Sequence, residues 1–397
     1  MSQTLVNEIL FEVEKFPLEE LVSELIRTPS VNPKDMEDCK RWGIIPGEAA
    51  LAEMLHDRLA QIGLEVELQE IVPGRSNLIA RYAGDKPGIT LAFNAHLDTV
   101  GAYEMGEHAF QPITRDERIY GRGAADMKGA LGCFIAALAT LAKVRPPIHG
   151  QVLLTAVIGE EGPPSGTKYL LQRGFQADGV IVGEASECRL FIGQRGGQFV
   201  RIKTSGKSGH GSMPSSGVNA IEHMIRLLTS IPEMNLFKRG GNEYGTPTCS
   251  IGTIHGGVRT NVIPEDCQAT LDIRLPPGIA PLEVIEAFEQ QLNALKLQGS
   301  VEAEETGYPA CLTPLDAPIV QAVSKAMRMI DLPLEKSLAP YWTDLFHLHQ
   351  AGIPGVIFGP GSILRAHSGE EYVEIDQLYL ATKVYALTAL FFCGELR

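Results

Sequence analysis

The chain has 397 residues, 44% of them hydrophobic and 21% charged, and its formal net charge at pH 7 is -14. This length exceeds what a single core usually supports and predicts two domains. The acidic balance disfavours a nucleic-acid partner, which needs clustered Lys and Arg, and the lack of a run of about 20 apolar residues disfavours a membrane partner.

The N-terminal segment and the cysteines bear on the cellular compartment. Residues 1–15 mix glutamates with apolar positions and lack the basic start and unbroken apolar stretch of a secretory signal, so a cytoplasmic location is expected. The seven cysteines are odd in number and never spaced as C-x-x-C, which argues against a disulfide framework or a thiolate metal site. Reduced, mostly buried thiols are expected.

Short apolar runs alternate with helical patterns in the first half of the chain. The patterns predict strands at 89–93, 152–158 and 179–182, and a helix at 128–144. This alternation is typical of the α/β class, with a mostly parallel sheet covered by helices on both faces. Each strand runs into a polar or Gly-rich segment, beyond the carboxyl end where ligands bind in such sheets. These segments are Asn94–Asp98, Gly159–Gly162 and Gly183–Ala185.

The pattern changes near residue 191. Strands at 198–204, 248–254, 268–275 and around 301 are combined with helices from about 218 and from 281. This β-α-β-β-α-β order is that of a ferredoxin-like domain. A helix at 318–330, a helix at 343–351 and a strand at 355–358 then resume the first pattern. We therefore predict a domain formed by 1–190 and 309–397, interrupted by an inserted lid and dimerisation domain at 191–308.

His96 and Asp98 follow the first of these strands. Side chains two apart on an extended segment point to the same side, so the Asp98 carboxylate can orient the His96 ring through its second nitrogen. Imidazole and carboxylate ligands without thiolates suit zinc, cobalt or manganese. A histidine at a strand end is also a common structural residue, so the pattern needs supporting residues.

Acidic residues supply that support. A Gly-rich turn, Gly121–Gly129, delivers Asp126 to the start of a helix, although an N-cap is the alternative role. Glu160 and Glu161 end a strand together, an arrangement that is unfavourable without a cation but tolerable in a solvated loop. Because neighbouring side chains point opposite ways, Glu161 can bind metal while Glu160 serves as general base for a metal-activated water.

Taken in order along the chain, these segments resemble the zinc-dependent aminoacylase and carboxypeptidase superfamily. That group contains acetylornithine deacetylases, succinyl-diaminopimelate desuccinylases and glutamate carboxypeptidases. The resemblance covers almost the whole chain. The segments that carry it are Asn94–Asp98, Gly121–Gly129, Gly159–Gly162, Gly183-Glu184, Gly206–Pro214, Thr260–Pro264, Asp272–Arg274 and Gly359–His367.

The resemblance implies a centre of two divalent metal ions. The first ion would be bound by His96 and Glu184, the second by Glu161 and His367, and Asp126 would bridge both. Zinc is favoured, with cobalt or manganese as alternatives.

The resemblance also implies the roles of five further residues. Glu160 is the general base, and Asp98 is the residue behind His96. His210 matches a lid histidine that reaches into the partner subunit's site and stabilises the oxyanion, which implies a homodimer. Asn261 and Arg274 match positions that hold the substrate carboxylate.

The stretches at 206–221 and 359–367 look most like acetylornithine deacetylases, whereas Gln194–Gly197 departs from the Arg-Arg-Gly-Ser of desuccinylases. We therefore expect a two-metal amidohydrolase that removes the acyl group from a small N-acyl-amino acid or acts on a short peptide. A dipeptidase or carboxypeptidase of the same superfamily is the alternative, and a catalytically silent binding protein is a less favoured one.

Overall fold

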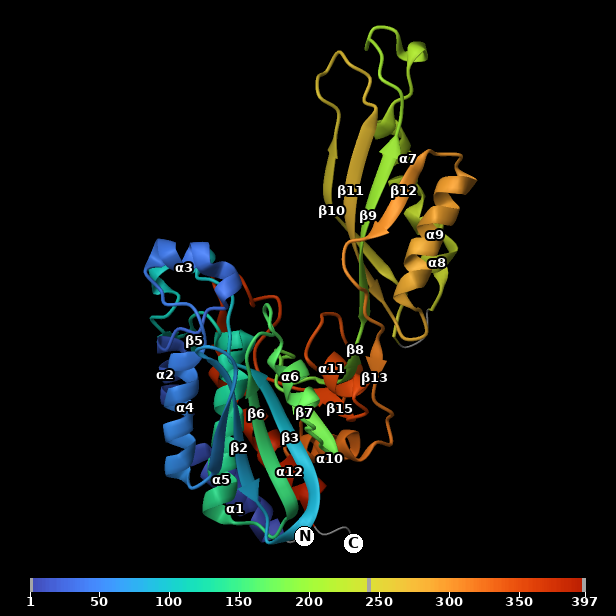
Figure 1. Cartoon of the computed structure of the whole chain (residues 1–397). Helices are drawn as coiled ribbons and strands as arrows, with labels where there is room; N and C mark the ends of the chain where they lie inside the picture. The colour runs from blue at the N-terminus through green and yellow to red at the C-terminus, as the bar shows by residue number, and fades with distance from the viewer. Residues whose placement is uncertain (1–2, 241–243, 395–397) are drawn as a thin grey trace. The chain divides into compact units, whose positions relative to one another are not determined.

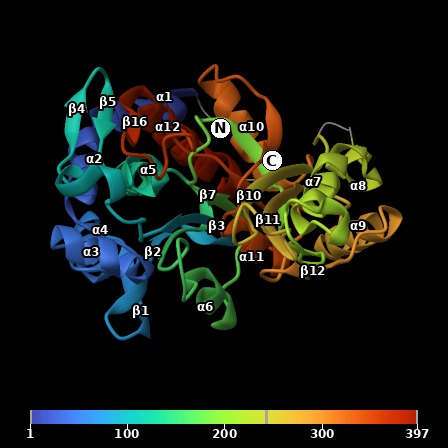
Figure 2. The ribbon, with the colours of Figure 1, turned by 90° about the horizontal axis from the view of Figure 1, so that it is seen from above.

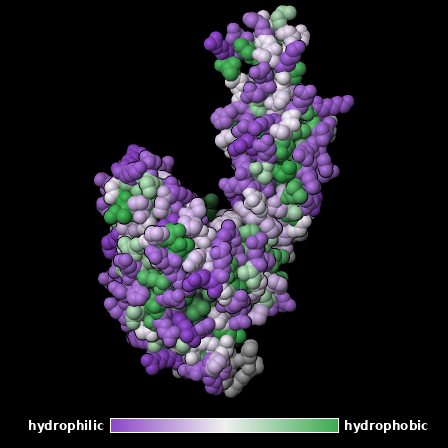
Figure 3. All heavy atoms as spheres, in the orientation of Figure 1, coloured by the Kyte–Doolittle hydropathy of each residue, from purple (hydrophilic) through white to green (hydrophobic). Residues whose placement is uncertain are grey.

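The computed structural model describes residues 3–240 and 244–394, which fold into two compact units. The first unit comprises Met1–Gly193, Thr313–Lys336 and Thr343–Arg397, and the second comprises Gln194–Leu312 and Ser337–Trp342. The segment Ser337–Trp342 thus belongs to the second unit, although the sequence pattern placed it in the first domain. On the face shown in Figure 3, hydrophilic residues dominate and apolar residues are scattered.

The first unit is built on a mixed sheet (Figure 1). Its hydrogen-bonded order is β1 (Glu65–Val72), β2 (Arg75–Ala83), β6 (His149–Val157), β3 (Lys86–His96), β7 (Gly179–Val182), β15 (Gly355–Ile357), β8 (Leu190–Gln194) and β13 (Cys311–Leu312). Strand β14 (Lys336–Ala339) pairs with β8 outside this order. Neighbouring strands from β6 to β15 are parallel, and the pairs β1–β2, β2–β6 and β15–β8 are antiparallel. The predicted α/β class with a parallel central sheet is confirmed.

Helices lie on both faces of this sheet (Figure 2). On one face are α1 (Gln3–Lys15), α5 (Gly129–Val144), α10 (Pro318–Met329) and α12 (Ile375–Cys393), and on the other are α6 (Gly166–Gln172) and α11 (Leu345–Gln350). Helix α11 begins two residues later than predicted, because the Thr343 hydroxyl accepts a hydrogen bond from the Leu345 N–H. The remaining helices are α2 (Leu18–Arg27), α3 (Met36–Trp42) and α4 (Ala49–Ile62), and the short turns are η1 (Pro33–Asp35), η2 (Tyr103–His108) and η3 (Ala124–Lys128).

Helix α5 is apolar on all sides and almost wholly buried. Together with the preceding turn, Ala124–Val144 is the one helix among the described residues that is long and apolar enough to cross a membrane, and most of it is buried. A helix that is apolar all round belongs either in a core or in a membrane, and its packing against α12 and the sheet accounts for its composition.

A small antiparallel sheet connects distant parts of the first unit. It consists of β4 (Ile113–Arg115), β5 (Arg118–Tyr120) and β16 (Tyr372–Glu374), with Tyr372 opposite Tyr120. It therefore joins the segment before Asp126 to the segment after His367.

The second unit has the predicted β-α-β-β-α-β order (Figure 1). Its elements are β9 (Gly196–Ser205), α7 (Ala220–Ser230), β10 (Thr248–Gly256), β11 (Asp266–Leu275), α9 (Pro281–Ala294) and β12 (Gly299–Ala303), with η4 (Pro214–Ser216), η5 (Ile231–Glu233) and α8 (Asn235–Lys238) as shorter pieces. The antiparallel sheet order β10-β11-β9-β12 is that of a ferredoxin-like domain. Buried residues alternate with exposed or partly exposed ones along β11, so one face packs on the helices.

Candidate metal centre

Five polar side chains converge near the carboxyl ends of the parallel strands in the first unit. His96 is the last residue of β3, which continues three residues beyond its predicted end and pairs His96 with Val157 of β6. The other four lie outside the sheet strands: Asp126 in turn η3, Glu161 after β6, Glu184 after β7 and His367 between β15 and β16. Two groups of possible metal ligands result, and both contain Asp126.

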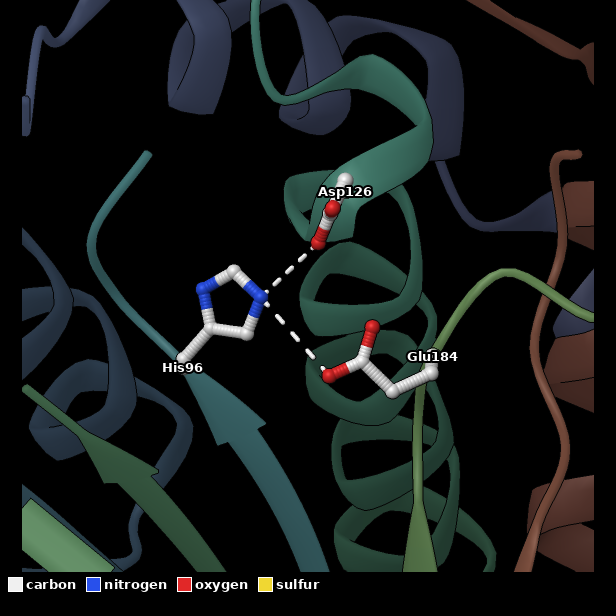
Figure 4. Close-up of side chains that lie close together, drawn as sticks. All are labelled: His96, Asp126 and Glu184. Carbon is white, nitrogen blue, oxygen red and sulfur yellow. Dashed lines mark hydrogen bonds and ion pairs between the residues drawn. The ribbon is translucent and has the colours of Figure 1, made fainter. Parts of the chain in front are cut away.

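The first group consists of His96, Asp126 and Glu184 (Figure 4). The His96 Nε2 atom lies 2.9 Å from Asp126 Oδ1 and 3.8 Å from Glu184 Oε1. All three residues are buried. Glu184 Oε1 receives no hydrogen bond from any described residue. A buried carboxylate oxygen without a donor is unfavourable, and a cation would relieve this.

The second group consists of Asp126, Glu161 and His367. The His367 Nε2 atom lies 2.8 Å from Glu161 Oε1 and 3.3 Å from Asp126 Oδ2. The His367 side chain is half exposed, so this group is open to solvent. Since Asp126 turns Oδ1 to one group and Oδ2 to the other, it has the geometry of a bridging carboxylate.

The turn before α5 places Asp126. The N-cap residue of α5 is Lys128, so the capping role considered for Asp126 is wrong. Asp126 itself has non-helical dihedral angles, φ -128° and ψ 91°. Its backbone N–H donates to Glu371 Oε1 at 3.1 Å, a contact that sequence reasoning missed because the two residues are far apart in the chain.

Asp98 contacts both His96 and the loop that carries Glu160 and Glu161, but not in the expected way. The His96 Nδ1 atom lies 2.8 Å from the main-chain carbonyl oxygen of Asp98, and the nearer carboxylate oxygen is 3.7 Å away. The carbonyl therefore orients the ring, which leaves Nε2 for the ligand groups. The predicted orientation by the Asp98 carboxylate is wrong in the atom involved.

The Asp98 carboxylate instead holds the loop after β6. It accepts hydrogen bonds from the backbone N–H groups of Gly159, Glu160 and Glu161, at 2.9, 3.2 and 3.1 Å. The Asn32 side-chain amide donates a fourth, at 2.8 Å, and a second N–H of this amide reaches the Gly162 carbonyl. Asn32 carries no sequence signal beyond preceding a proline, so its role could be found only in three dimensions.

The electrostatics of the site indicate an excess of negative charge. Burial and the nearby Glu184 carboxylate raise the pKa of Glu160 well above its usual value, and burial and Asp126 do the same for the pKa of Glu184. Hydrogen bonds that the His367 ring donates to Asp126 and Glu161 raise the pKa of His367 to about 10. Burial opposes protonation of His96, but Asp126 and Glu184 outweigh it and its pKa is raised. Carboxyl and imidazole groups that hold protons this tightly mark a place where divalent cations would be stabilised.

Glu160 belongs to neither ligand group, although it precedes Glu161 directly. The predicted division between a ligand and a second, free carboxylate is therefore compatible with the geometry. Lys34 lies on the other side of Glu161, with Nζ 3.4 Å from Oε2, and was not singled out in the sequence.

The other predicted site residues belong to the second unit. His210 is exposed, and its Nδ1 atom lies 2.7 Å from the Ser212 hydroxyl. The carbonyl of Asn261 accepts the Gly211 N–H at 2.8 Å, so the loops that carry His210 and Asn261 lie side by side.

Arg274, on β11, is already paired. Its Nε lies 2.8 Å from Asp272 Oδ1, Nη2 donates to Asp272 Oδ2 at 3.0 Å, and Nη1 donates to the Tyr308 hydroxyl at 2.6 Å. One edge of the guanidinium is thus occupied by Asp272, and Tyr308 is a partner that sequence reasoning missed.

Comparison with known proteins covers most of the chain. The family model described as peptidase family M20/M25/M40 matches residues 92–390. The acetylornithine deacetylase of Edwardsiella ictaluri is 31% identical, over 90% of this chain and 92% of that protein. The N-formyl-4-amino-5-aminomethyl-2-methylpyrimidine deformylase of Bacillus subtilis is 26% identical, over 97% and 96% of the two chains.

Solved structures share the fold. A tripeptidase from Staphylococcus aureus superposes with a TM-score of 0.77 at 23% identity, over 94% of this chain and 98% of that one. The YXEP protein of Bacillus subtilis, described as a dinuclear metal binding peptidase, gives a TM-score of 0.69 at 16% identity, over 96% and 98% of the two chains.

Proposed function

The chain belongs to peptidase family M20/M25/M40 and is an enzyme that hydrolyses amide bonds, and from this premise we propose that it removes an acyl group from an N-acyl-amino acid with two divalent metal ions. The superfamily resemblance and the hydrolase class predicted from the sequence are confirmed. The observation that carries the proposal is the pair of ligand groups that share Asp126.

The donor set suits two cations. His96 and Glu184 would hold the first ion, Glu161 and His367 the second, and Asp126 both. The ligand atoms are imidazole nitrogens and carboxylate oxygens, a set that favours zinc, with cobalt and manganese as alternatives. The buried Glu184 Oε1 receives no hydrogen bond from the described residues, which supports a cation beside it. Bound there, the ions would supply Lewis acidity toward the scissile carbonyl and the attacking water.

Glu160 is the residue we propose as general base. It stands next to a ligand without joining either group, and Asp98 fixes its backbone N–H. A carboxylate in this position would accept the proton of the attacking water and pass it to the leaving nitrogen.

Glu160→Gln tests that role. The variant should bind the same number of metal ions as the wild type, because it keeps all five ligands, and should lose turnover by about 10²–10⁴-fold. Glu187→Gln is the control, since Glu187 is an exposed glutamate outside both groups. Unchanged turnover in Glu160→Gln would assign the base elsewhere.

For the substrate, we propose an N-acyl-amino acid whose carboxylate is held by Asn261 and Arg274. The similar deacetylase and deformylase both carry names of enzymes that remove a small acyl group from nitrogen, which supports a deacylase over a dipeptidase. The test is a comparison of N-acetyl, N-formyl and N-succinyl amino acids with dipeptides, after chelation and after addition of zinc, cobalt or manganese. Full turnover after complete metal removal, or a strong preference for dipeptides, would contradict the proposal.

We further propose a cytoplasmic homodimer formed through the second unit, in which the partner subunit supplies His210 to stabilise the oxyanion. Strand β10 supports this, because it is an edge strand whose residues are all at least partly exposed, with Ile251 and Ile254 49% and 47% exposed. An unpaired edge strand with apolar side chains is suited to pairing with a second copy.

Mixing subunits tests the shared site. A His210→Ala subunit and a Glu160→Gln subunit should each have little activity as homodimers, but a mixed dimer would contain one intact site if His210 acts on the partner. Random mixing at equal amounts should then restore about a quarter of wild-type activity. No recovery in dimers shown to be mixed would contradict sharing, and Ile254→Lys should yield monomers by light scattering.

A further inference from the structure

A buried ion pair lies behind the bridging carboxylate of Asp126. Arg122 and Glu371 are both essentially inaccessible to solvent, and Arg122 Nη1 lies 2.5 Å from Glu371 Oε2. The other carboxylate oxygen, Oε1, accepts the backbone N–H groups of Ala125 and Asp126, at 3.0 and 3.1 Å. Burying two charges is costly unless every donor and acceptor is matched, so the pair should serve more than packing.

The remaining donors of Arg122 connect three segments of the first unit. Nε donates to the Gly101 carbonyl at 2.8 Å, and Nη1 also reaches the Ser368 carbonyl at 3.4 Å. The carbonyl of Glu371 in turn accepts the Gly121 N–H at 3.1 Å. Ser368 directly follows His367, so the pair ties the loop that carries His367 to the turn that carries Asp126.

Glu371 occupies a position that only a carboxylate can satisfy. Its two oxygens face three donors: two backbone N–H groups and one guanidinium N–H. A carboxylate accepts at both oxygens, whereas a glutamine side chain carries an NH₂ group that would face one of these donors in either orientation. The interaction is therefore specific for charge and geometry, not for size.

We propose that Glu371, held by Arg122, is a positioning residue that fixes the Asp126 backbone and the His367 loop so that both ligand groups keep their geometry. Glu371 touches neither substrate nor the ligand atoms. Because Asp126 must present one oxygen to each group, a small rotation of its backbone would disturb both groups together. This inference rests on the proposed two-metal function, and it adds the residues that make the bridge rigid.

The test uses Glu371→Gln with metal binding as the readout. Zinc is titrated into the metal-free full-length protein by calorimetry and by competition with a chelator, and the absorption spectrum of the cobalt-substituted protein is recorded. Loss of a partner behind a ligand typically weakens metal binding about 10–100-fold. We expect this loss, together with an altered cobalt spectrum and a lower kcat at saturating metal, while KM changes little.

Two further variants separate positioning from general stability. Leu55→Ala removes a buried side chain of α4, so it should lower the melting temperature and leave zinc affinity and the cobalt spectrum unchanged. Arg122→Lys keeps the charge but loses the guanidinium fork, so its zinc affinity should fall less than that of Glu371→Gln. It replaces Glu371→Gln as the test if that variant does not fold.

Wild-type zinc affinity and an unchanged cobalt spectrum in a folded Glu371→Gln or Arg122→Lys variant would overturn the inference, whatever the melting temperature. An equal loss of zinc affinity in Leu55→Ala would overturn it too. If the wild-type protein binds no metal ion, the proposed function fails instead.

Discussion

Replacing Asp344 by Asn should make the stability of the metal-free protein less dependent on pH. The Asp344 carboxylate is buried, and Oδ2 accepts a hydrogen bond from the Thr167 hydroxyl at 2.7 Å. The other oxygen, Oδ1, has no hydrogen-bond partner among the described residues. Burial raises the pKa of Asp344 from 3.8 to about 6, although the Thr167 hydrogen bond and nearby His96 counteract part of this effect.

The magnitude follows from linkage between protonation and folding. A carboxyl group whose pKa is higher in the folded state costs nothing below the unfolded value of 3.8 and its full penalty above about pH 6. A rise from 3.8 to about 6 corresponds to a penalty of about 3 kcal/mol. Asn carries no such penalty, but its NH₂ group would lie where Oδ1 lacks a partner, which costs about 1–3 kcal/mol at every pH. The two effects nearly cancel near neutral pH, so the change with pH is the informative quantity.

The assay is urea unfolding with a chelator present, at several values between about pH 4 and pH 7.5. In a Trp342→Phe background, Trp42 is the remaining tryptophan and reports on the first unit, which contains Asp344. The free energy of unfolding of Asp344→Asn, taken relative to its parent, should rise by about 2.4 kcal/mol over this range, because part of the penalty is already present at pH 4. The exposed Asp316, replaced by Asn, is the control. A difference between variant and parent that stays constant with pH would refute the reasoning.

Three further outcomes follow from the site. Asp98→Asn places an NH₂ group among four donors and should loosen the loop that carries Glu160, so turnover of the metal-saturated enzyme should fall about 10²-fold; normal turnover would contradict this. His367, whose pKa is raised to about 10 by Asp126 and Glu161, is protonated at neutral pH in the metal-free protein. Metal binding should release at least this proton, which is measurable at neutral pH by calorimetry in buffers of different ionisation enthalpy; no release would contradict this. Tyr308→Phe removes a hydrogen bond to Arg274 and should raise KM about fivefold without changing metal stoichiometry; an unchanged KM would contradict it.

Much of the fold could be predicted from the sequence, because the patterns that indicate strands and helices are local. The apolar runs of the first unit predicted β3, β6, β7 and α5, and the alternation of strands and helices predicted the main elements of the second, with boundaries within about three residues. Helices α1–α4 and α12 and strands β1 and β2 were not predicted. Strand β3 reaches His96 because its last residues pair with β6 and β7, a contact between segments about sixty residues apart or more that no local pattern contains. Ser337–Trp342 belongs to the second unit because of long-range packing as well.

The candidate metal ligands could be predicted from the sequence for a related reason. Parallel strands bring their carboxyl ends to one edge of the sheet, so polar residues after each strand could be expected to meet. No such rule predicts which residues hold the ligands in place. Asn32 reaches Asp98 across 66 positions, and Glu371 reaches the Asp126 backbone across 245. Periodicity placed Asp98 behind His96 but could not show that the carbonyl, not the carboxylate, contacts the ring.

The candidate metal-site residues and the candidate substrate-binding residues lie in different units, so variants of the two sets should have different effects. All five candidate ligands and Glu160 come from the first unit, whereas Asn261 and Arg274 come from the second, which has a hydrophobic core of its own. Changes distant from one another and without shared partners act nearly independently. Variants of Arg274 should therefore alter substrate binding at constant metal affinity, and variants of Glu371 should alter metal affinity at nearly constant KM. A variant of Arg274 that lost metal would show that the two units do not act independently, and the ligand groups would then need a contribution from outside the first unit.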